Sequence, residues 1–317
     1  MKAVRIHGHG GPEALVWEDA PRPVPGPGEI LVRVAAAGVN PADYKHRNGM
    51  FRDFVPYVFP KILGYDVAGT VEAHGRDAGG PETEGPDSGR PAPGTRVFAM
   101  LDPLTAGGYA QYVAVPAHFC AVIPEGMDFA TAAALPCPAL TGTQMVEEIL
   151  RPAMGETVLV TGATGMVGRF AILAVRNAGA RAIAAVRPAY ADEARLLGAD
   201  GVAVLGGPAW DGPPFDGMID TVGGRAASAL ASAVKSGGRI LSAATDPLDP
   251  ALLPVVPEFI AVHPDGSGLG RIAAAVMAGK VDVPIVARIP MAEAQRAHEA
   301  IEGGSVRGKI VLMADGG

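Results

Sequence analysis

The chain has 317 residues, enough for two domains that each bury their own core. Hydrophobic residues make up 49% of the chain and charged residues 19%, which excludes a disordered protein and indicates a globular one. The formal net charge of −7, without a block of Lys or Arg, gives no indication of a nucleic-acid partner.

Targeting segments and disulfides are not indicated either. Residues 1–15 lack the apolar core of a signal peptide, and no stretch approaches the roughly 20 apolar residues that span a bilayer. The two cysteines, Cys120 and Cys137, provide neither a disulfide framework nor a four-cysteine zinc site. We therefore expect a cytoplasmic protein that has no membrane partner.

The first part of the chain consists of short β-prone runs bounded by Gly and Pro. Residues 74–94 contain almost no apolar side chain and predict an exposed loop, and residues 21–28 predict a second loop that its prolines stiffen. The predicted strands are 3–6, 29–35, 68–72, 95–100 and 109–115.

At about Pro124 the pattern changes to strands that alternate with helices. Asp128 is placed to cap a helix over 130–135, and Gly179 to end a helix over 166–178. This alternation predicts parallel βαβ units. The predicted strands of this region are 157–161, 182–186, 201–205, 217–220 and 239–243, with a further helix over 192–197. After Pro264 we predict helices over 269–278 and 291–301 and a final strand over 309–313.

A glycine-rich turn is the strongest chemical signal. It follows the strand 157–161, opens the next helix and has the form G-x-x-G-x-x-G. A pyrophosphate binds backbone N–H groups at a helix N-terminus, where side chains would block its approach. We therefore expect a dinucleotide to bind the whole turn: Gly162, Ala163, Thr164, Gly165, Met166, Val167 and Gly168.

The end of the following strand indicates which dinucleotide binds. NAD enzymes place Asp or Glu there to hold the ribose 2′-hydroxyl. Here the strand ends at Val186-Arg187-Pro188, and no acid occurs between Gly168 and Asp192. An Arg pairs with a 2′-phosphate, which an acid would repel. We predict that NADPH is the cofactor and that Arg187 binds its 2′-phosphate. The alternative is that Arg187 is a solvated loop residue.

Motifs along nearly the whole chain resemble those of a known family. They are Gly-Val-Asn-Pro-Ala-Asp-Tyr-Lys (38–45), Leu-Gly-Tyr-Asp-Val-Ala-Gly (63–69), Gly-Gly-Tyr-Ala-Gln-Tyr (107–112), the glycine turn, Asp-Thr-Val-Gly-Gly (220–224) and Gly-Lys-Ile-Val-Leu (308–312). Together they resemble the medium-chain dehydrogenase/reductases, on the zinc-independent quinone oxidoreductase and zeta-crystallin branch. The form of 64–69 is most similar to enone and alkenal reductases.

The resemblance implies an α/β protein with a Rossmann doubly wound parallel sheet plus a β-rich GroES-like domain. The GroES-like domain is expected from residues 1–124 and 265–317, and the Rossmann domain from residues 125–264. The resemblance also implies a homodimer, or a tetramer, that forms through the Rossmann sheet.

Zinc-dependent members of this family bind catalytic zinc through Cys, His and Cys. The matching positions here are Asn40, Tyr65 and Cys137. One thiolate does not hold a zinc ion that needs three protein ligands. His7 and His9 are spaced to share a strand face, but we interpret them as loop or surface residues. We expect no metal.

Without a Lewis acid, the suitable substrates are already electrophilic: a quinone, or the alkene of an α,β-unsaturated carbonyl. The resemblance places the 40–45 turn at the nicotinamide. Asn40 is a candidate hydrogen-bond donor to the substrate oxygen or to the nicotinamide ribose, and Tyr44 and Lys45 are candidate donors to an enolate, with Lys45 a candidate general acid. Many quinone reductases have Tyr where this chain has Lys45, which leaves the proton donor open. Tyr65 is a candidate pocket residue. Each of the four has a purely structural alternative: a turn cap, packing or solvation.

The resemblance implies further cofactor contacts. Thr141 matches the position that touches the nicotinamide ring, and Lys309 the position near the phosphates or ribose. His263 has the chemistry of a proton donor, but we interpret it, like Cys137, as a structural residue. The expected backbone contacts come from Thr221, Val222, Gly223, Ser242, Ala243, Ala244 and Val262.

These residues predict an NADPH-dependent reductase of quinones or α,β-unsaturated carbonyls. Two alternatives stay open. One is an enoyl-thioester reductase of a biosynthetic pathway, and the other is a non-catalytic, crystallin-like protein that binds NADPH.

Overall fold

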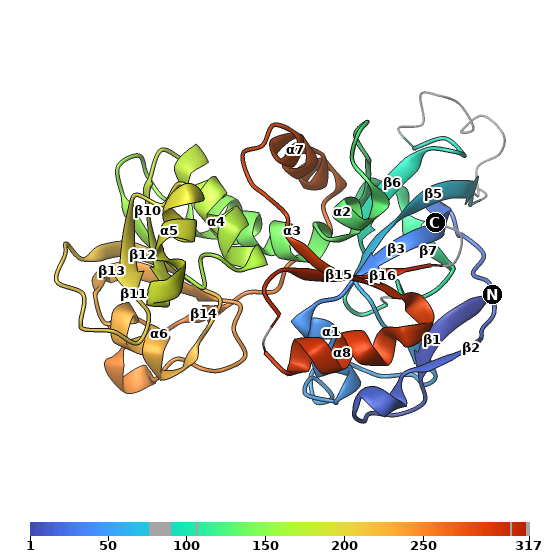
Figure 1. The fold of residues 1–317 in the computed structure, drawn as a ribbon, viewed down its shortest axis with the longest axis horizontal. Coiled ribbons are helices and arrows are strands. Elements are labelled where there is room, and N and C mark those ends of the chain that lie inside the picture. The colour runs from blue at the N-terminus through green and yellow to red at the C-terminus, as the bar shows by residue number, and fades with distance from the viewer. Residues whose placement is uncertain (76–89, 106, 305, 315–317) are drawn as a thin grey trace. The chain divides into compact units, whose positions relative to one another are not determined.

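The computed structural model describes residues 1–75, 90–105, 107–304 and 306–314 (Figure 1). The chain divides into two compact units. Unit 1 comprises Met1–Cys137 and His263–Gly317, and unit 2 comprises Pro138–Val262. Of the loop predicted over 74–94, residues 76–89 lie outside the described ranges.

Unit 1 contains two sheets. A seven-stranded sheet has the order β15-β16-β3-β5-β6-β8, with β7 also paired to β3, and a three-stranded sheet has the order β2-β1-β4. All pairs are antiparallel except β15 with β16. The strands are β1 (Lys2–Ile6), β2 (Val16–Asp19), β3 (Glu29–Gly38), β4 (Lys61–Ile62), β5 (Asp66–His74), β6 (Arg96–Met100), β7 (Tyr112–Pro116), β8 (Cys120–Val122), β15 (Ile285–Pro290) and β16 (Lys309–Met313).

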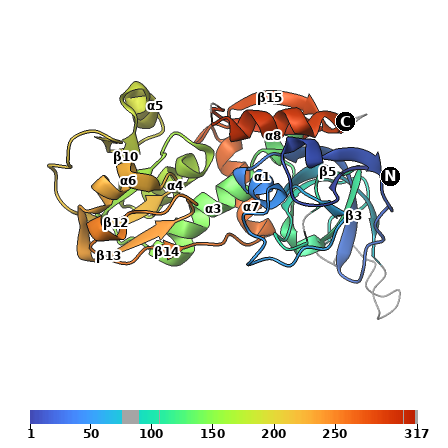
Figure 2. The same cartoon turned by 90° about the horizontal axis from the view of Figure 1, so that it is seen from below.

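Short helices pack on the seven-stranded sheet of unit 1. Helix α2 begins after Asp128, whose side chain accepts a hydrogen bond from the Thr131 N–H at 2.6 Å, as the capping prediction requires. It packs on β3 and β5, which is why unit 1 continues to Cys137, beyond the expected boundary at residue 124. Helix α8 packs beside β15 and β16 (Figure 2). The helices are α1 (Pro41–Arg47), α2 (Phe129–Ala133), α7 (Gly266–Met277) and α8 (Ala294–Glu302).

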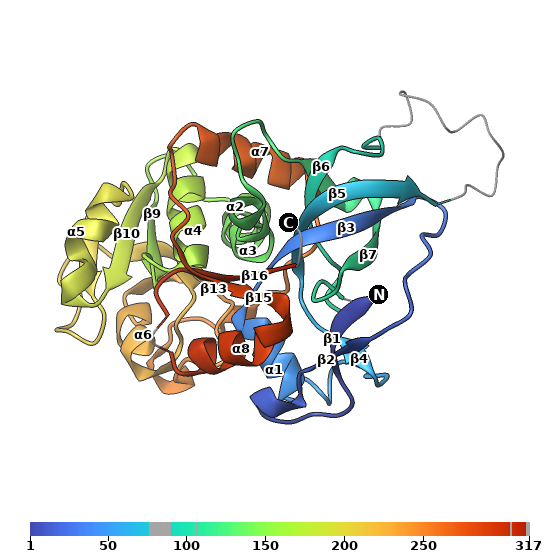
Figure 3. The ribbon, with the colours of Figure 1, turned by 45° about the vertical axis from the view of Figure 1, so that its right-hand side comes forward.

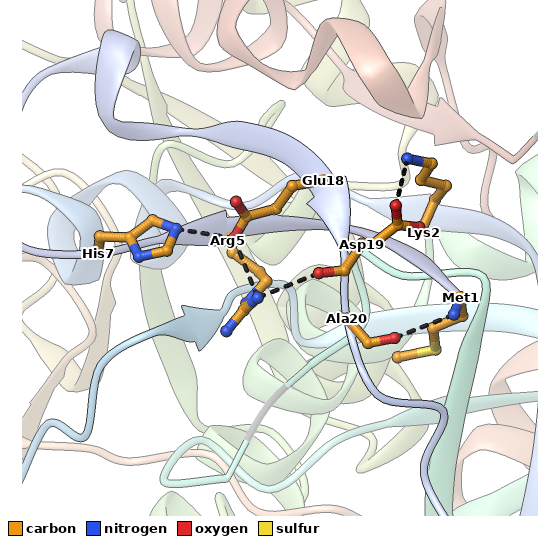
Figure 4. Close-up of polar contacts among 7 residues, drawn as sticks. All are labelled: Met1, Lys2, Arg5, His7, Glu18, Asp19 and Ala20. Carbon is orange, nitrogen blue, oxygen red and sulfur yellow. Dashed lines mark hydrogen bonds and ion pairs between the residues drawn. The ribbon is translucent and has the colours of Figure 1, made fainter.

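The β1–β2 hairpin explains one of the two N-terminal histidines (Figure 4). His7 Nε2 lies 2.7 Å from Glu18 Oε1, and Arg5 pairs with the same oxygen at 3.1 Å. His7 is therefore part of a surface ion-pair cluster, as expected. His9 is also an exposed loop residue, as expected, and its ring packs edge-on against the rings of Tyr57 and Phe59.

Unit 2 is a six-stranded parallel sheet with the order β11-β10-β9-β12-β13-β14. This is the doubly wound order of a Rossmann fold. Helix α3 (Pro136–Gln144), which begins in unit 1, leads into the unit and continues as a π-helix over Met145–Leu150. The strands are β9 (Thr157–Thr161), β10 (Arg181–Val186), β11 (Gly201–Val204), β12 (Phe215–Asp220), β13 (Val234–Ser242) and β14 (Glu258–Phe259), and the helices are α4 (Met166–Asn177), α5 (Ala191–Leu196) and α6 (Gly224–Ala231).

Both faces of this sheet are buried because its strands are apolar on both sides. Val158 and Val160 of β9 belong to the core formed with α4 and α5, whereas Leu159 belongs to the core formed with α6. Figure 3 shows the strands of this sheet with α4, α5 and α6 around them. The predicted α/β class with a Rossmann sheet and a β-rich GroES-like domain is confirmed.

Candidate functional site

The glycine-rich turn has the geometry of a pyrophosphate-binding turn. Gly162 has φ +61°, and a Cβ there would lie 2.4 Å from Thr221 Oγ1. A Cβ on Gly168 would lie 2.4 Å from the carbonyl oxygen of Gly162, so this glycine lets α4 approach the turn. Gly165 is the N-cap of α4, and no side chain caps the helix. The first N–H groups of α4 therefore suit a phosphate.

Asp220, which the sequence reasoning did not select, organises the carboxyl end of the sheet. Its buried carboxylate accepts hydrogen bonds from Thr161 Oγ1 at 2.6 Å, Ser242 Oγ at 2.8 Å and the Gly223 N–H at 3.0 Å. These donors lie at the ends of β9, β13 and β12. One acid therefore fixes together the segments 221–223 and 242–244 predicted to contact a cofactor. The signal in the sequence that could have identified Asp220 is its place as an acidic residue at the end of a buried apolar strand.

Arg187 follows β10 directly and is exposed. Its guanidinium carbon lies 5.2 Å from the Tyr190 ring centroid. The two acids downstream are both neutralised: Asp192 pairs with Arg195, and Glu193 with the buried Arg169.

Two further predicted cofactor residues lie at the borders of unit 2. Thr141 is buried on α3, and a Cβ on the next residue, Gly142, would lie 2.4 Å from the carbonyl oxygen of Val167, so α3 closely approaches the start of α4 here. Val262 is half-buried at the last position of the unit. His263 is exposed, with Nδ1 at 3.3 Å from the Pro264 carbonyl oxygen.

A hollow of about 560 Å³ lies elsewhere on unit 2. None of the predicted cofactor residues lines it, so the hollow does not mark the glycine turn. Its lining residues are Gly224, Arg225, Asp246, Pro247, Leu248, Asp249, Pro250 and Leu252.

In unit 1, Asn40 is the N-cap of α1, and all its polar contacts are internal. Its backbone N–H donates to Asp43 Oδ2 at 2.7 Å, and its side-chain Nδ2 donates to Asp66 Oδ2 at 2.8 Å. Its Oδ1 accepts from Lys309 Nζ at 2.7 Å. One of the two Nδ2 hydrogens of the Asn40 amide is therefore left to donate to another group.

Lys309, predicted to lie near the cofactor phosphates or ribose, is buried beside Asn40. Its ammonium also pairs with Asp66 Oδ2 at 3.3 Å, and both side chains are almost fully buried. Burial raises the pKa of Asp66, and the positive charge of Lys309 opposes that rise. Asp66 Oδ1 accepts from the Cys137 N–H at 2.7 Å.

Asp43 is a second buried carboxyl close to the first. Its Oδ2 accepts from the Asn40 N–H and from the Tyr109 hydroxyl at 2.9 Å, whereas Oδ1 is buried without a hydrogen-bond partner. Burial raises the pKa of Asp43 to about 7, and the neighbouring Asp66 adds to the rise.

The other candidate catalytic residues surround the same turn. Burial raises the pKa of Tyr44, with Glu302 adding to the rise, and lowers the pKa of the half-buried Lys45. Tyr65 is 4% exposed, its ring centroid lies 5.6 Å from that of His46, and burial raises the pKa of its hydroxyl. His46 accompanies Tyr57 in this aromatic cluster, and burial lowers its pKa to about 4.

Sequence reasoning missed five residues around this turn. Tyr109 was predicted inside a strand, but β7 begins at Tyr112 and Tyr109 is buried in the loop before it. Asp43 and Asp66 lie within the motifs 38–45 and 63–69. The signal that could have identified them is an acidic residue among apolar neighbours in the sequence. Nothing in the sequence connects Arg47 with His298, which lie in hydrogen-bond contact in the fold.

In the regions that the structure describes, no group of three or more His, Cys, Asp or Glu side chains is placed to hold a metal. The same regions contain no helix long and apolar enough to cross a membrane.

Comparison with known proteins identifies the family. Residues 26–125 match the alcohol dehydrogenase GroES-like domain, and residues 197–312 match the model described as zinc-binding dehydrogenase. The chain is 27% identical to the chloroplastic quinone-oxidoreductase QR1 of Triphysaria versicolor over 334 aligned positions, which cover 98% of each chain.

Two solved structures superpose over 99% of this chain. One is an NAD-dependent alcohol dehydrogenase, with 29% identity, a TM-score of 0.82 and 99% of its own chain covered. The other is a mycobacterial protein complexed with NADPH, with 27% identity, a TM-score of 0.81 and 100% of its own chain covered. The chain belongs to the medium-chain dehydrogenase/reductase family, as a quinone-oxidoreductase-like, NAD(P)-dependent oxidoreductase.

Proposed function

We propose that this protein is a zinc-independent reductase that uses NADPH to transfer a hydride to a quinone or to the alkene of an α,β-unsaturated carbonyl. The observation that carries the proposal is the carboxyl edge of the unit 2 sheet. There the first N–H groups of α4, after the glycine turn, and the exposed Arg187 offer hydrogen-bond donors and a positive charge to a phosphorylated dinucleotide, and the segments ordered by Asp220 lie at the same edge.

NADPH rather than NADH is proposed because of Arg187. Among the described residues it has no ion-pair partner, and the next two acids along the chain, Glu193 and Asp192, pair with Arg169 and Arg195. NADPH, when bound, supplies the hydride. The residues proposed to hold it are those of the turn 162–168, Arg187, Thr141, the segments 221–223 and 242–244, Val262 and Lys309.

The residues of unit 1 are proposed to serve the substrate. Hydride addition to an enone leaves negative charge on the carbonyl oxygen, and hydrogen-bond donors stabilise that charge. Asn40 retains one amide hydrogen for this purpose, and its position is fixed by Lys309 and Asp66. Lys45, whose pKa burial lowers, is the proposed proton donor, with Tyr44 as a second donor. Tyr65 is proposed to line the substrate pocket.

Zinc independence follows from the side chains at the three positions that hold catalytic zinc in related dehydrogenases. Asn40 uses its amide on Asp66 and Lys309, Tyr65 is a phenol and Cys137 is a single thiol. This set does not form a catalytic zinc site.

The edge of the unit 2 sheet supports the expected homodimer. The outer strand β14 leaves Phe259 65% exposed, and an edge strand with an exposed aromatic side chain is suited to pairing with a second copy. The Triphysaria relative is named chloroplastic, and we retain the cytoplasm as the proposed compartment.

The test is oxidation of NADPH, followed at 340 nm, after dialysis against EDTA. The acceptors are quinones, alkyl enones and crotonyl thioesters, with NADH assayed alongside. We expect turnover with quinones or enones and a preference for NADPH. Turnover of the thioester alone would favour an enoyl-thioester reductase, and loss of activity that zinc restores would refute zinc independence.

Arg187→Ala tests the cofactor assignment. Loss of a charge-assisted contact of about 1.5–3 kcal/mol should weaken NADPH roughly ten- to hundredfold and leave NADH unchanged. The matched control is Arg181→Ala, which removes an exposed arginine from the opposite end of the same strand. Equal weakening of both cofactors by Arg187→Ala would contradict the assignment.

A further inference from the structure

A chain of four buried side chains connects α8 to the Asn40 turn. Arg47 Nη1 lies 3.1 Å from His298 Nδ1, His298 Nε2 lies 3.3 Å from the Tyr109 hydroxyl, and that hydroxyl lies 2.9 Å from Asp43 Oδ2. None of the four is more than 1% exposed.

The direction of every hydrogen bond in the chain is fixed. A guanidinium only donates, so His298 Nδ1 accepts from Arg47. The proton of the neutral imidazole then lies on Nε2 and is donated to the Tyr109 oxygen, and burial lowers the pKa of His298 to about 3, which keeps the ring neutral. Tyr109 is left with its own proton to donate, and Asp43 is the acceptor.

This chain does not transfer protons, because its far end retains them. A guanidinium donates protons to hydrogen bonds but accepts none. That of Arg47 also donates to the Gly10 carbonyl oxygen at 3.1 Å and pairs with Glu302. It therefore holds His298 in one tautomer. The chain is a mechanical and electrostatic support for Asp43.

Tyr109 is itself held rigidly. Its backbone N–H donates to the Leu63 carbonyl oxygen at 2.9 Å, and its own carbonyl oxygen accepts from the Val4 N–H at 2.8 Å. A Cβ on Gly64 would lie 2.4 Å from the Tyr109 ring, so the ring packs directly on this backbone. The hydroxyl has little freedom to leave Asp43.

We propose that Tyr109 is a positioning residue of the candidate site: its hydroxyl, oriented by His298 and Arg47, holds Asp43 in place, and Asp43 in turn holds the Asn40 N–H at the start of α1. The proposal rests on the assignment of Asn40 to the substrate in the proposed function. It adds that the C-terminal helix α8 helps to set the geometry of the turn.

The charge of Asp43 reports on this contact. The charged groups that act on it are Asp66 on β5 and Lys309 on β16, and the phenols of Tyr109 and Tyr65 also interact with it. The Tyr109 hydrogen bond lowers the pKa of Asp43 against the effect of burial, so removal of the hydroxyl should raise it.

The experiment is a carbon-13 NMR titration of protein labelled at the aspartate carboxyl carbon. The resonance that disappears in Asp43→Asn is assigned to Asp43. Loss of a hydrogen bond to a charged group should raise its titration midpoint by about one pH unit or more in Tyr109→Phe. The matched control is Tyr112→Phe, in which the tyrosine faces Arg22 and not Asp43.

His298 supplies a second pair of variants. His298→Gln accepts from Arg47 with its oxygen and donates to Tyr109 with its nitrogen, so its midpoint should stay near that of the wild type. His298→Phe does neither and should raise the midpoint by less than Tyr109→Phe does, because the Tyr109 hydroxyl still donates to Asp43 but is no longer oriented by His298. An unchanged midpoint in Tyr109→Phe or, if that variant does not fold, in His298→Phe overturns the proposal.

An activity measurement separates positioning of the site from local structure. With an accepted substrate, Tyr109→Phe should lower kcat about tenfold, leave KM for NADPH unchanged and shift the pH profile of kcat upward with the NMR midpoint. A moved midpoint with an unaltered kcat profile would refute the positioning role. If no acceptor is turned over, the proposed function fails, while the NMR titration still decides the contact between Tyr109 and Asp43.

Discussion

Asp43→Asn should remove a pH-dependent cost to stability. In the unfolded chain an aspartate titrates near pH 4, whereas burial in the folded protein raises the pKa of Asp43 to about 7. The folded state therefore binds the proton more tightly than the unfolded state does. The stabilisation due to this proton is complete below about pH 4 and is lost as the pH rises to about 7.

The magnitude follows from the size of the shift. A rise from 3.8 to about 7 corresponds to about 4 kcal/mol in total, of which about 3 kcal/mol falls between pH 5 and pH 8. Asparagine has the same shape and still accepts from the Asn40 N–H and the Tyr109 hydroxyl. The free-energy cost of burying the asparagine amide does not depend on pH. The free energy of unfolding of the wild type minus that of Asp43→Asn should therefore fall by about 3 kcal/mol between pH 5 and pH 8.

The assay is urea unfolding at intervals from pH 5 to pH 8, followed by tryptophan fluorescence. The protein has two tryptophans, Trp17 in unit 1 and Trp210 in unit 2, so a Trp210→Phe background makes the signal report on the unit that contains Asp43. Asp53→Asn, at an exposed aspartate, is the control and should give a difference that is flat with pH. If Asp43→Asn gives an equally flat difference, the carboxyl is not perturbed in the folded protein and the argument from burial is wrong.

Two further substitutions test the unit 2 geometry. Gly162→Ala should destabilise the fold by about 1–3 kcal/mol and abolish NADPH binding, since its Cβ would meet Thr221 in a positive-φ conformation. Gly155→Ala shares the positive φ but has open space, so equal effects of the two in thermal unfolding would rule out the clash. Phe259→Asp should convert the expected dimer to a monomer in light scattering, and Leu196→Asp, at another exposed apolar position, should not. A dimer that survives Phe259→Asp would place the interface elsewhere.

The sequence by itself determined the elements whose signals are local. The strand Thr157–Thr161, the helix from Met166 and the glycine turn between them follow from apolar runs and glycine spacing, and the structure confirms them. The Asp128 cap needs only a side chain three residues from its donor. The alternation of strands and helices was sufficient to predict the parallel sheet, because parallel strands need crossover connections.

Elements without such signals appeared only in the tertiary structure. Helix α1 is predicted only as a turn, because its seven residues contain no apolar repeat, although Asn40 at the N-cap and Pro41 in the first turn are local start signals. The sequence does not predict the π-helix Met145–Leu150 or strand β15, because each depends on contacts with elements that are distant in the sequence. Lys309 was assigned to the cofactor by resemblance, and only the fold showed its ammonium on Asn40 and Asp66.

The buried polar chain shows the physical reason most directly. Tyr109 is 66 residues from Asp43 and 189 from His298, and His298 is 251 residues from Arg47. A pattern within a sequence window reports only which face of a helix or strand is apolar. The pairing of buried polar groups is decided when distant elements pack and each donor must find an acceptor, and that requirement is met only in the folded molecule.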